Sequence, residues 1–490
     1  MLDAQTTHHD AHAYSVVAFA DSHMYNTLEH EPYVIVADGF GTFQETISIY
    51  RVDKGEPKLI ERIYGYANSL GLMYQFATAF CGMKENQDEY KFLGYESHIK
   101  EVLSEAQLLK LLTTIKVESK AFVERLESPH AKCIFPKHLD EFGFSMSSLI
   151  NIEALKHAKK FTYGPMFERL QQTVFSGEDK IQLTQYNQRV VIGFAVQYIL
   201  EDVLFYFVSK YKMKNLLTCG GVFYNVKLNN FLLNTISGLY CTNPLNGDQG
   251  AAFGLFAKNN PDKQIDYKGL IFGSKSHPAQ SVKDLPKTLG QQRYEQTIFL
   301  CNESDSEAIT EKLNRGEVVN MVRKGHEFGP RALCHTTTLA LPTKAHAEYI
   351  NILNNRNEVM PMAPVMLESC LSYFEANEYN RTVGVDMYMI MTYTLKSNKK
   401  EDLEPIAGVI HKHPVSGKYT ARPQVVTPRS SPFMYRILRE ITGGMLINTS
   451  YNYHGEPIIL TYENALSTHE KQCDKAKELG LPLPYLAIVY

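Results

Sequence analysis

The stretch Tyr33-Val-Ile-Val-Ala-Asp-Gly-Phe-Gly41 decides the fold class of the first half of the chain. Its apolar run ends at an aspartate beside glycines, and a second strand-like stretch, Thr46-Ile-Ser-Ile-Tyr-Arg-Val52, follows after a polar turn. This order predicts a strand, a glycine-bearing turn and a second strand. Such turns commonly face phosphate groups, so we expect Asp38 at the bend to lie beside a ligand.

The segments that follow add helices to this hairpin. Apolar residues recur at three- and four-residue spacing over residues 70–80 and again over 190–208, which predicts two helices. The stretch Asn215-Leu-Leu-Thr-Cys-Gly-Gly-Val222 then predicts a short strand that runs into paired glycines, with a helix starting near Asn225. This order is typical of an α/β domain whose ligand lies at the ends of its strands.

Regular patterns disappear between about residues 258 and 296, where Asn, Pro, Lys, Asp, Gly, Ser and His dominate. A helix over 306–315 and a strand over 318–322 then begin a second α/β unit. We therefore predict three parts: a first domain over residues 1–262, a linker over 263–296 and a second domain over 297–490.

The overall composition excludes several classes of protein. With 490 residues and 44% hydrophobic content the chain can bury a large core, and 50 basic against 53 acidic residues give no field that would attract nucleic acid or anionic lipid. There is no run of eighteen apolar residues and no signal peptide, and the eight cysteines are scattered without a C-x-x-C pair. We predict a cytoplasmic protein with free thiols and no membrane segment.

The first candidate site is His8-His9-Asp10-Ala11-His12. On a helix, His8 and His12 face the same way and can share one metal ion, whereas His9 stays free to accept a proton or is an exposed bystander. A histidine-rich stretch is also typical of a solvated terminus, so spacing alone leaves the metal hypothesis open. Further ligands would come from Asp38 and from Asp248.

Two glycine-rich stretches are the next candidates. Asp248 precedes a Gly/Ala-rich helix start, where a carboxylate can bind a cation while the helix amides face an anion; the alternative is a helix cap. Gly220 and Gly221 allow a backbone to approach a ligand closely, and Asn225 at the next helix start can hydrogen-bond a ribose or a base edge.

Ten short motifs occur along the chain in a fixed order. The first half carries His-His-x-x-His-Ala, Asp-Gly-x-Gly, Asn68-Ser-Leu-Gly-Leu-x-Tyr74, Asp88-Glu-Tyr-Lys91, Gly-Gly-Val-x-x-Asn and Gly-Asp-x-Gly. The second half carries Glu327-Phe-Gly-Pro-Arg-Ala-Leu333, Arg356 before Pro361-Met-Ala-Pro364, Thr420-Ala-Arg-Pro-Gln424 and Asn448-Thr-Ser-Tyr-Asn-x-x-Gly-Glu-Pro457. In this order the set resembles the carbamoyltransferases of nodulation and antibiotic tailoring.

The resemblance implies a fold and a two-step reaction. The first domain would be an actin-like ATPase (ASKHA) type domain, similar to the threonylcarbamoyl-transferring proteins of tRNA modification. The second would be an α/β adenylate-forming domain, similar to threonylcarbamoyl-adenylate synthase. The second domain would condense carbamoyl phosphate with ATP into a carbamoyl adenylate, and the first would pass the carbamoyl group to an acceptor hydroxyl. A sugar, another natural product and a hydroxymethylated nucleotide all remain open as acceptors.

The resemblance also assigns roles to residues. The catalytic set would be His8, His12, Asp248 and Arg331, and the metal ligands His8, His12, Asp38 and Asp248. These donors suit Fe(II), Mn(II) and Zn(II), and the resemblance favours iron. Nucleotide and phosphate would bind to Gly220, Gly221, Asn225, Lys324, Arg331, Arg356, Arg422, Asn448, Thr449, Ser450 and Asn452, with help from Arg323. For the Asn448–Asn452 stretch the alternative is an ordinary polar turn.

The chain departs from the family pattern in two ways. Family members normally begin well before the histidine motif, so we expect a complementing chain, an upstream start or a rebuilt acceptor site. Arginines that are usual in the second domain are replaced at Gly325, Thr336 and Met360, which would cost roughly 1.5–3 kcal/mol for each lost charge-assisted bond. These departures favour, as an alternative, a non-catalytic or complementing nucleotide-binding subunit. Because both domain types resemble that pathway, tRNA threonylcarbamoyl transfer is a second alternative; a homodimer is also open.

Overall fold

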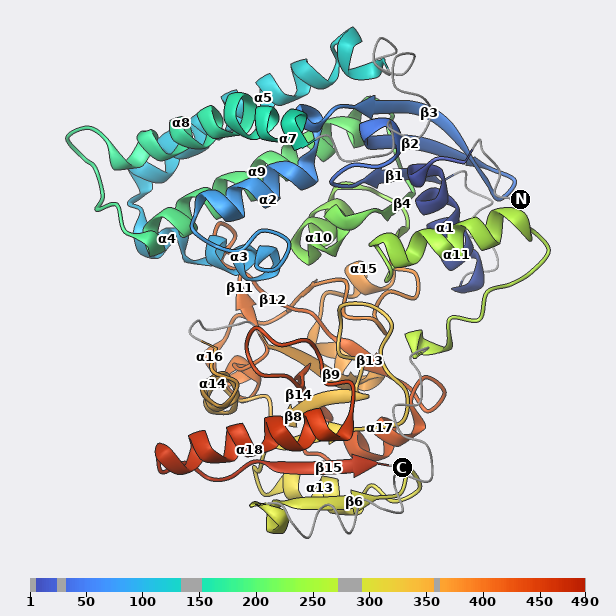
Figure 1. The fold of residues 1–490 in the computed structure, drawn as a ribbon, viewed down its shortest axis with the longest axis vertical. Helices are drawn as coiled ribbons and strands as arrows, with labels where there is room; N and C mark the ends of the chain where they lie inside the picture. The colour runs from blue at the N-terminus through green and yellow to red at the C-terminus, as the bar shows by residue number, and fades with distance from the viewer. Residues whose placement is uncertain (1–5, 24–31, 134–151, 272–292, 357–361, 490) are drawn as a thin grey trace. The chain divides into compact units, whose positions relative to one another are not determined.

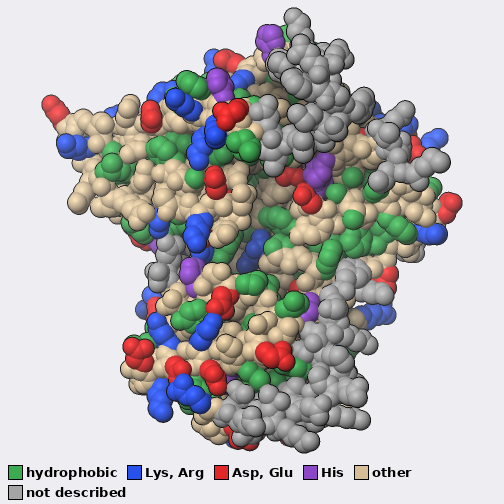
Figure 2. All heavy atoms as spheres, in the orientation of Figure 1, with side chains coloured by type: hydrophobic (Ala, Val, Ile, Leu, Met, Phe, Trp, Pro, Cys, Tyr) green, Lys and Arg blue, Asp and Glu red, His purple; other side chains and the backbone are tan. Residues whose placement is uncertain are grey.

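The computed structural model describes residues 6–23, 32–133, 152–271, 293–356 and 362–489. The chain divides into two compact units, which are described separately. The first unit comprises Met1–Asp266 with two later segments, Arg381–Val385 and His413–Gly417, and the second comprises the remainder. Charged side chains of both signs are interspersed over the face drawn in Figure 2, as the near-equal counts of acidic and basic residues lead one to expect.

The first unit is built on a five-stranded sheet of order β3-β2-β1-β4-β5 (Figure 1). Its strands are β1 (Tyr33–Ala37), β2 (Glu45–Asp53), β3 (Glu56–Tyr64), β4 (Leu216–Cys219) and β5 (Tyr240–Thr242). β1 pairs with β2 in antiparallel and with β4 in parallel orientation. The predicted hairpin and the predicted strand before the paired glycines are therefore confirmed, and they are neighbours on the two sides of β1.

Helices α1 (His8–His23) and α11 (Asp248–Asn259) pack on each other, and α1 also packs against the sheet. A second group of helices pack mainly on one another: α2 (Leu70–Phe80), α5 (Glu105–Leu126), α8 (Gly164–Phe175) and α9 (Gln185–Lys210). α10 (Val226–Thr235) follows the paired glycines, as predicted. In the described residues α9 is long and apolar enough to cross a membrane, but 72% of its apolar window is buried inside the protein, as in a core helix.

A segment far downstream completes the edge of this sheet. Thr382 forms a parallel bridge with Tyr240 of β5, and the Arg381 guanidinium donates to the carbonyl oxygens of Gly238 and Ile236 at 3.0 and 2.9 Å. The first domain predicted from the sequence, residues 1–262, does not include this segment. A stretch this short leaves no periodic pattern in the sequence that would reveal its pairing with a distant strand.

The second unit contains a seven-stranded mixed sheet of order β13-β9-β14-β8-β7-β15-β6. The strands are β6 (Ile298–Cys301), β7 (Val319–Val322), β8 (Thr336–Ala340), β9 (Ala363–Leu367), β13 (Gln424–Val426), β14 (Met445–Ser450) and β15 (Tyr485–Val489). Helices α13 (Glu307–Asn314) and α17 (Pro432–Arg439) share one apolar core with the sheet, and α18 (Tyr462–Glu478), which packs on α14 (Lys344–Leu353), contributes to another. The prediction of an α/β second unit is thus confirmed, and all eight cysteines are free thiols as expected.

One ionisable group in the helical part of the first unit has an unusual environment. Glu201 of α9 accepts a hydrogen bond from Gln197 at 2.7 Å, and burial together with the neighbouring Glu96 raises its pKa to about 8. In the unfolded chain the pKa of a glutamate is close to 4.3. At neutral pH the folded protein therefore holds a proton on Glu201 that the unfolded chain has released.

We expect this proton to make stability depend on pH. As pH rises from 5 to 8 the folded state must bind a proton that the unfolded chain lacks, so the free energy of unfolding falls. The substitution Glu201→Gln removes this dependence and should raise the free energy of unfolding at pH 8, relative to wild type, by at least about 1 kcal/mol more than at pH 5. Urea unfolding at both pH values measures the difference, with Glu124→Gln on the exposed face of α5 as control. Equal pH slopes for wild type and Glu201→Gln would contradict the assignment.

Candidate metal centre

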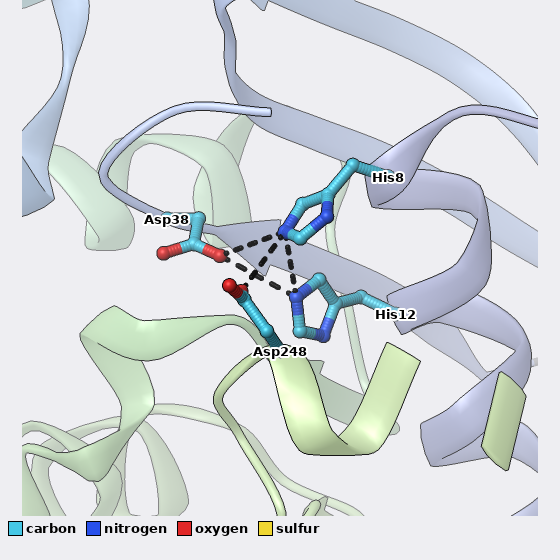
Figure 3. Close-up of side chains that lie close together, drawn as sticks. All are labelled: His8, His12, Asp38 and Asp248. Atoms are coloured by element: carbon cyan, nitrogen blue, oxygen red, sulfur yellow. Dashed lines mark hydrogen bonds and ion pairs between the residues drawn. The ribbon is translucent and has the colours of Figure 1, made fainter. Parts of the chain in front are cut away.

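Four side chains converge at the end of β1 (Figure 3). The Nε2 atoms of His8 and His12 lie 3.1 Å apart, and Asp38 Oδ2 lies 3.3 and 3.4 Å from them. Asp248 Oδ1 lies 3.5 Å from His8 Nε2. The four ligand atoms are all within 4.8 Å of one another. The structure therefore brings together the four residues that sequence reasoning selected as metal ligands.

The start of α1 is fixed by the β1–β2 turn. The backbone N–H of His8 donates to Thr42 Oγ1 at 3.0 Å, and that of His9 donates to Glu45 Oε1 at 2.8 Å. These side chains satisfy amides that have no partner inside the helix. The first helical turn is thus anchored rather than frayed, and the alternative of a solvated histidine-rich terminus is wrong.

His9 does not have the environment of an exposed bystander. It is fully buried, its Nδ1 lies 2.8 Å from Ser48 Oγ, and burial holds its pKa well below the ordinary range. Because Ser48 belongs to β2, this contact joins α1 to the sheet. This histidine therefore helps to hold α1 on the sheet.

Asp38 is held by the start of α2. Its own carboxylate accepts from the Gly39 amide at 2.7 Å, and Ser69 Oγ donates to the Gly39 carbonyl at 2.5 Å while accepting from Leu72 as the cap of α2. The Asn68-Ser69 motif thus has a structural role, because it joins the aspartate turn to a helix N-terminus.

The paired glycines lie against the same aspartate. A Cβ on Gly221 would lie 2.9 Å from Asp38 Oδ1, and one on Gly220, which has φ of +101°, would lie 2.3 Å from the Ala37 carbonyl oxygen. Close packing on the strand that carries Asp38 therefore requires both glycines. Nucleotide binding by Gly220 and Gly221 stays a prediction.

Asn225 is engaged within the protein. Its Oδ1 caps α10 by accepting from the Leu228 amide at 3.0 Å, and its Nδ2 donates to Gln197 Oε1 at 2.6 Å. Helix capping accounts for this residue without a ribose or a base edge.

Asp248 occupies the first turn of α11, where the cap residue is Gly247 and no side chain caps the helix. The alternative that Asp248 is simply a cap is therefore wrong, and its side chain is 89% exposed. Further along α11, a Cβ on Gly254 would lie only 1.7 Å from the Ala11 carbonyl oxygen. This glycine allows α11 to approach α1 closely enough to bring Asp248 to His8.

A buried network that the motifs did not reveal holds α1 from the other side. Arg62 of β3 donates to the Asp10 carboxylate, and its Nε lies 3.2 Å from both Ser48 Oγ and Glu45 Oε2. Burial raises the pKa of Glu45 to about 7. A single sequence holds no signal for this role, because Arg62 lies in a charged stretch where an exposed strand face is the default interpretation.

The donor set fits a divalent cation. Burial would raise the pKa of Asp38, but hydrogen bonds from His12 and His8 hold it well below its ordinary value, so it is an anion. Burial lowers the pKa of His8, whereas Asp38 raises it and the net shift is upward. Two imidazole nitrogens that face each other beside two carboxylates form a nitrogen and oxygen set that Fe(II), Mn(II) and Zn(II) accept.

In the second unit, two predicted arginines lie close together. Burial and the neighbouring Arg331 hold the pKa of Arg422 well below its ordinary range, and the Arg422 Nη1 donates to the Met389 carbonyl at 3.3 Å. Among the described residues Arg422 forms no ion pair. Both arginines are half-buried, and two neighbouring guanidinium groups in such a setting attract an anion. Lys324, also predicted here, is exposed.

Arg356 and Asn448, two further predicted residues of this unit, both form hydrogen bonds within the protein. Arg356 Nη1 donates to Thr449 Oγ1 at 3.3 Å. Asn448 is 1% exposed, and its Nδ2 donates to Gln424 Oε1 and the Ala332 carbonyl at 2.8 and 2.9 Å. These bonds tie the loop before β8 to the sheet, so Asn448 acts inside the fold.

Ser450 and Asn452 form a local turn. Ser450 Oγ donates to Asn452 Oδ1 at 2.6 Å, and Asn452 Nδ2 donates to the Glu456 carbonyl at 2.8 Å. This is the ordinary polar turn that the sequence left open as an alternative. Arg323, by contrast, is buried, lies over the Phe433 ring and pairs with Glu303 at 3.1 Å, and its help in phosphate binding stays a prediction.

Two of the three replaced arginines have a structural explanation. Gly325 has φ of +79° and a Cβ there would meet Ile271, a conformation that an arginine rarely adopts. Thr336 is fully buried in β8. Met360 lies outside the described residues.

Comparison with known proteins places the chain. The family model described as Carbamoyltransferase N-terminus matches residues 3–256, and the model described as Carbamoyltransferase C-terminus matches residues 310–477. The first model lies within the first unit and the second lies mainly within the second unit, and the protein is thus a transferase built from two α/β parts. It belongs to the carbamoyltransferase family, of the nodulation and antibiotic-tailoring type.

Three relatives illustrate the relationship. Uncharacterized protein MJ1051 of Methanocaldococcus jannaschii is 28% identical over 84% of this chain and 71% of its own length. Nodulation protein NolO of Bradyrhizobium diazoefficiens is 25% identical over 94% of this chain and 75% of its own length. The 3'-hydroxymethylcephem-O-carbamoyltransferase of Streptomyces clavuligerus is 26% identical over 48% of this chain and 40% of its own length.

The contact of α1 with α11 yields a prediction for metal binding. Gly254→Ala places a methyl group against the α1 backbone, so the helices must separate and Asp248 must move away from His8. We expect the Kd for Mn(II) to rise at least about tenfold, because a lost carboxylate ligand weakens a site by about 1.4 kcal/mol or more. Isothermal titration measures the affinity.

A matched control separates this effect from a loss of stability. Ala252→Gly lies on the exposed side of α11 and lowers helix stability by about 1 kcal/mol without altering the contact with α1. It should bind Mn(II) as wild type does. Unchanged affinity in Gly254→Ala would show that the helix contact does not position Asp248.

Proposed function

We propose that this chain is an ATP-dependent O-carbamoyltransferase that works through a carbamoyl adenylate. The observation that carries the proposal is the convergence of His8, His12, Asp38 and Asp248 in the unit that matches the carbamoyltransferase N-terminal model. We further propose that this unit is actin-like and that the second unit is adenylate-forming.

The proposed first step belongs to the second unit. Carbamoyl phosphate, ATP and one water molecule give carbamoyl adenylate, pyrophosphate and phosphate. Both substrates carry negative charge, so their approach needs cationic donors that keep a fixed geometry. Arg331 is near enough to Arg422 to lower its pKa, and Arg356 donates to Thr449. Each of these guanidinium groups would donate to phosphate oxygens through its fork. The neighbouring positive charges of Arg331 and Arg422 repel each other, and a bound anion would relieve this repulsion.

The proposed second step belongs to the first unit. The acceptor hydroxyl attacks the carbamoyl carbon, AMP leaves and the hydroxyl proton is released. A divalent ion held by His8, His12, Asp38 and Asp248 would act as a Lewis acid that polarises the carbonyl. The ionised carboxylate of Asp38, fixed by Gly39 and Ser69, keeps the two imidazoles in orientation. Relatives that act on a hydroxymethyl group support a hydroxyl as the acceptor.

The first step can be tested without an acceptor. We expect carbamoyl phosphate to cause pyrophosphate release from ATP, and Arg331→Ala to reduce the rate about 10- to 100-fold, because a charge-assisted hydrogen bond contributes roughly 1.5–3 kcal/mol. A coupled pyrophosphate assay measures the rate, and Arg429→Ala, an exposed arginine of the same unit, serves as control. Absence of release from folded wild-type protein would instead favour the non-catalytic subunit.

The second step has its own test. In His12→Ala we expect bound metal to be lost and carbamoyl transfer to a hydroxymethylated acceptor to stop, whereas pyrophosphate release continues, because the ligands and the arginines lie in different units. Metal analysis and the two assays measure these quantities, with exposed His98→Ala as control. Loss of pyrophosphate release together with the metal would contradict the division of the two steps.

A further inference from the structure

A row of buried polar side chains crosses three strands of the sheet in the second unit and contacts α18. Thr449 of β14 is registered with Thr338 of β8, and Thr338 with Asn320 of β7. Directly opposed residues of antiparallel strands project from the same face, so the three side chains form one row. Thr338 Oγ1 donates to Asn320 Oδ1 at 2.7 Å, and both residues are at most 1% exposed. Polar groups at this depth need partners, and the row supplies them.

The row continues into the helices through Gln472 of α18. Asn320 Nδ2 donates to Gln472 Oε1 at 2.7 Å, and Gln472 Nε2 donates to Asn354 Oδ1 at 2.7 Å. Asn354 is the residue that ends α14, and its carbonyl accepts from the His454 amide at 2.9 Å. The side-chain amide of Gln472 therefore links the sheet to the end of α14, and the Asn354 carbonyl extends this link to the loop after β14.

The end of α14 carries one of the predicted phosphate-binding arginines. Arg356 follows Asn354 by two residues, and its backbone N–H donates to the Asn351 carbonyl at 2.9 Å. Its guanidinium reaches back to Thr449, the first member of the row. The residues thus close a ring: Thr449, Thr338, Asn320, Gln472, Asn354 and Arg356.

We propose that Gln472 is a positioning residue for Arg356. The proposal rests on the proposed function, because it takes Arg356 as a ligand for the phosphate group of a substrate. Gln472 is 1% exposed, which places its amide beneath the surface that a substrate can reach, so it would act through the turn that it holds. The Asn354 Nδ2 and both amide atoms of Asn351 lack a partner in the described part of the chain, so the Gln472 bond is what orients the Asn354 side chain.

The role differs from a general contribution to stability, and the difference can be measured. If Gln472 acts through Arg356, then its loss matters for anion binding only while Arg356 is present. If it merely stabilises the unit, its loss weakens binding equally with and without that arginine. Melting temperature reports the structural effect in both cases.

The experiment is a double-mutant cycle on the full chain, with freshly prepared carbamoyl phosphate as the probe. Gln472→Leu should raise its Kd at least about tenfold, or about 1.4 kcal/mol. In the Arg356→Ala background the same change should leave the Kd unaltered, although it lowers Tm by a similar amount in both backgrounds. Thr297→Val, which removes the buried 2.8 Å contact with His469 of the same helix, should lower Tm without changing the Kd.

Several outcomes would overturn the inference: an unchanged Kd in Gln472→Leu, an equal rise in both backgrounds, or no binding of carbamoyl phosphate by wild type. If Gln472→Leu does not fold, Asn354→Ala breaks the same link from its other end and takes its place in the cycle. Arg356-dependent binding without pyrophosphate release would refute the proposed adenylation and leave the role of Gln472 intact.

Discussion

The close contact between α1 and α11 is the constraint on which the candidate metal centre depends. His8 and His12 come from one helix and Asp248 from the other, and the two helices meet where Gly254 has no side chain to hold them apart. The remaining bonds of α1 serve the same geometry: the Cys219 thiol donates to the His12 carbonyl, and Arg62 binds Asp10 from β3. With α1 fixed on the sheet, the Nε2 atoms of His8 and His12 lie 3.3 and 3.4 Å from the Asp38 carboxylate at the end of β1.

The parts of this centre that sequence reasoning could find are those set by local geometry. Histidines four residues apart on a helix face the same way whatever surrounds them, and an aspartate directly after a strand lies at the end of that strand. The support of the centre could not be found in this way. Arg62, Glu45 and the segment from Arg381 act through contacts over long sequence distances, and nothing in their own neighbourhood distinguishes them from solvent-facing residues. The predicted roles of Asn225 and Asn448 show the converse: each amide has the right chemistry for a ligand, but the fold uses it internally.

Strand register explains why neighbouring residues of the motif at the end of β14 have separate roles. Successive residues of a strand point to opposite faces, so Asn448 reaches Gln424 and the loop before β8, whereas Thr449 meets Arg356 beside the row that ends at Gln472. A sequence motif contains both residues but does not show on which face of the sheet each side chain lies. The same logic applies to the replaced arginines: at Gly325 the backbone is left-handed and at Thr336 the position is inside the sheet, so a guanidinium at either place would need a different local structure.

The candidate site of the first unit carries negative side chains and that of the second unit carries positive ones, which supports the proposal of a reaction divided between them. In the first unit two carboxylates and two imidazoles form a site that attracts a cation, whereas in the second the half-buried Arg422 lies near Arg331 and forms no ion pair within the described chain. A site for phosphate charge and a site for a Lewis acid make conflicting electrostatic demands, because the carboxylates that hold a cation repel a free phosphate. Placing the two demands in separate folded units removes the conflict. In the proposed mechanism, an adenylate formed at the arginines would react where the metal ligands are, so each unit would carry one of the two proposed steps.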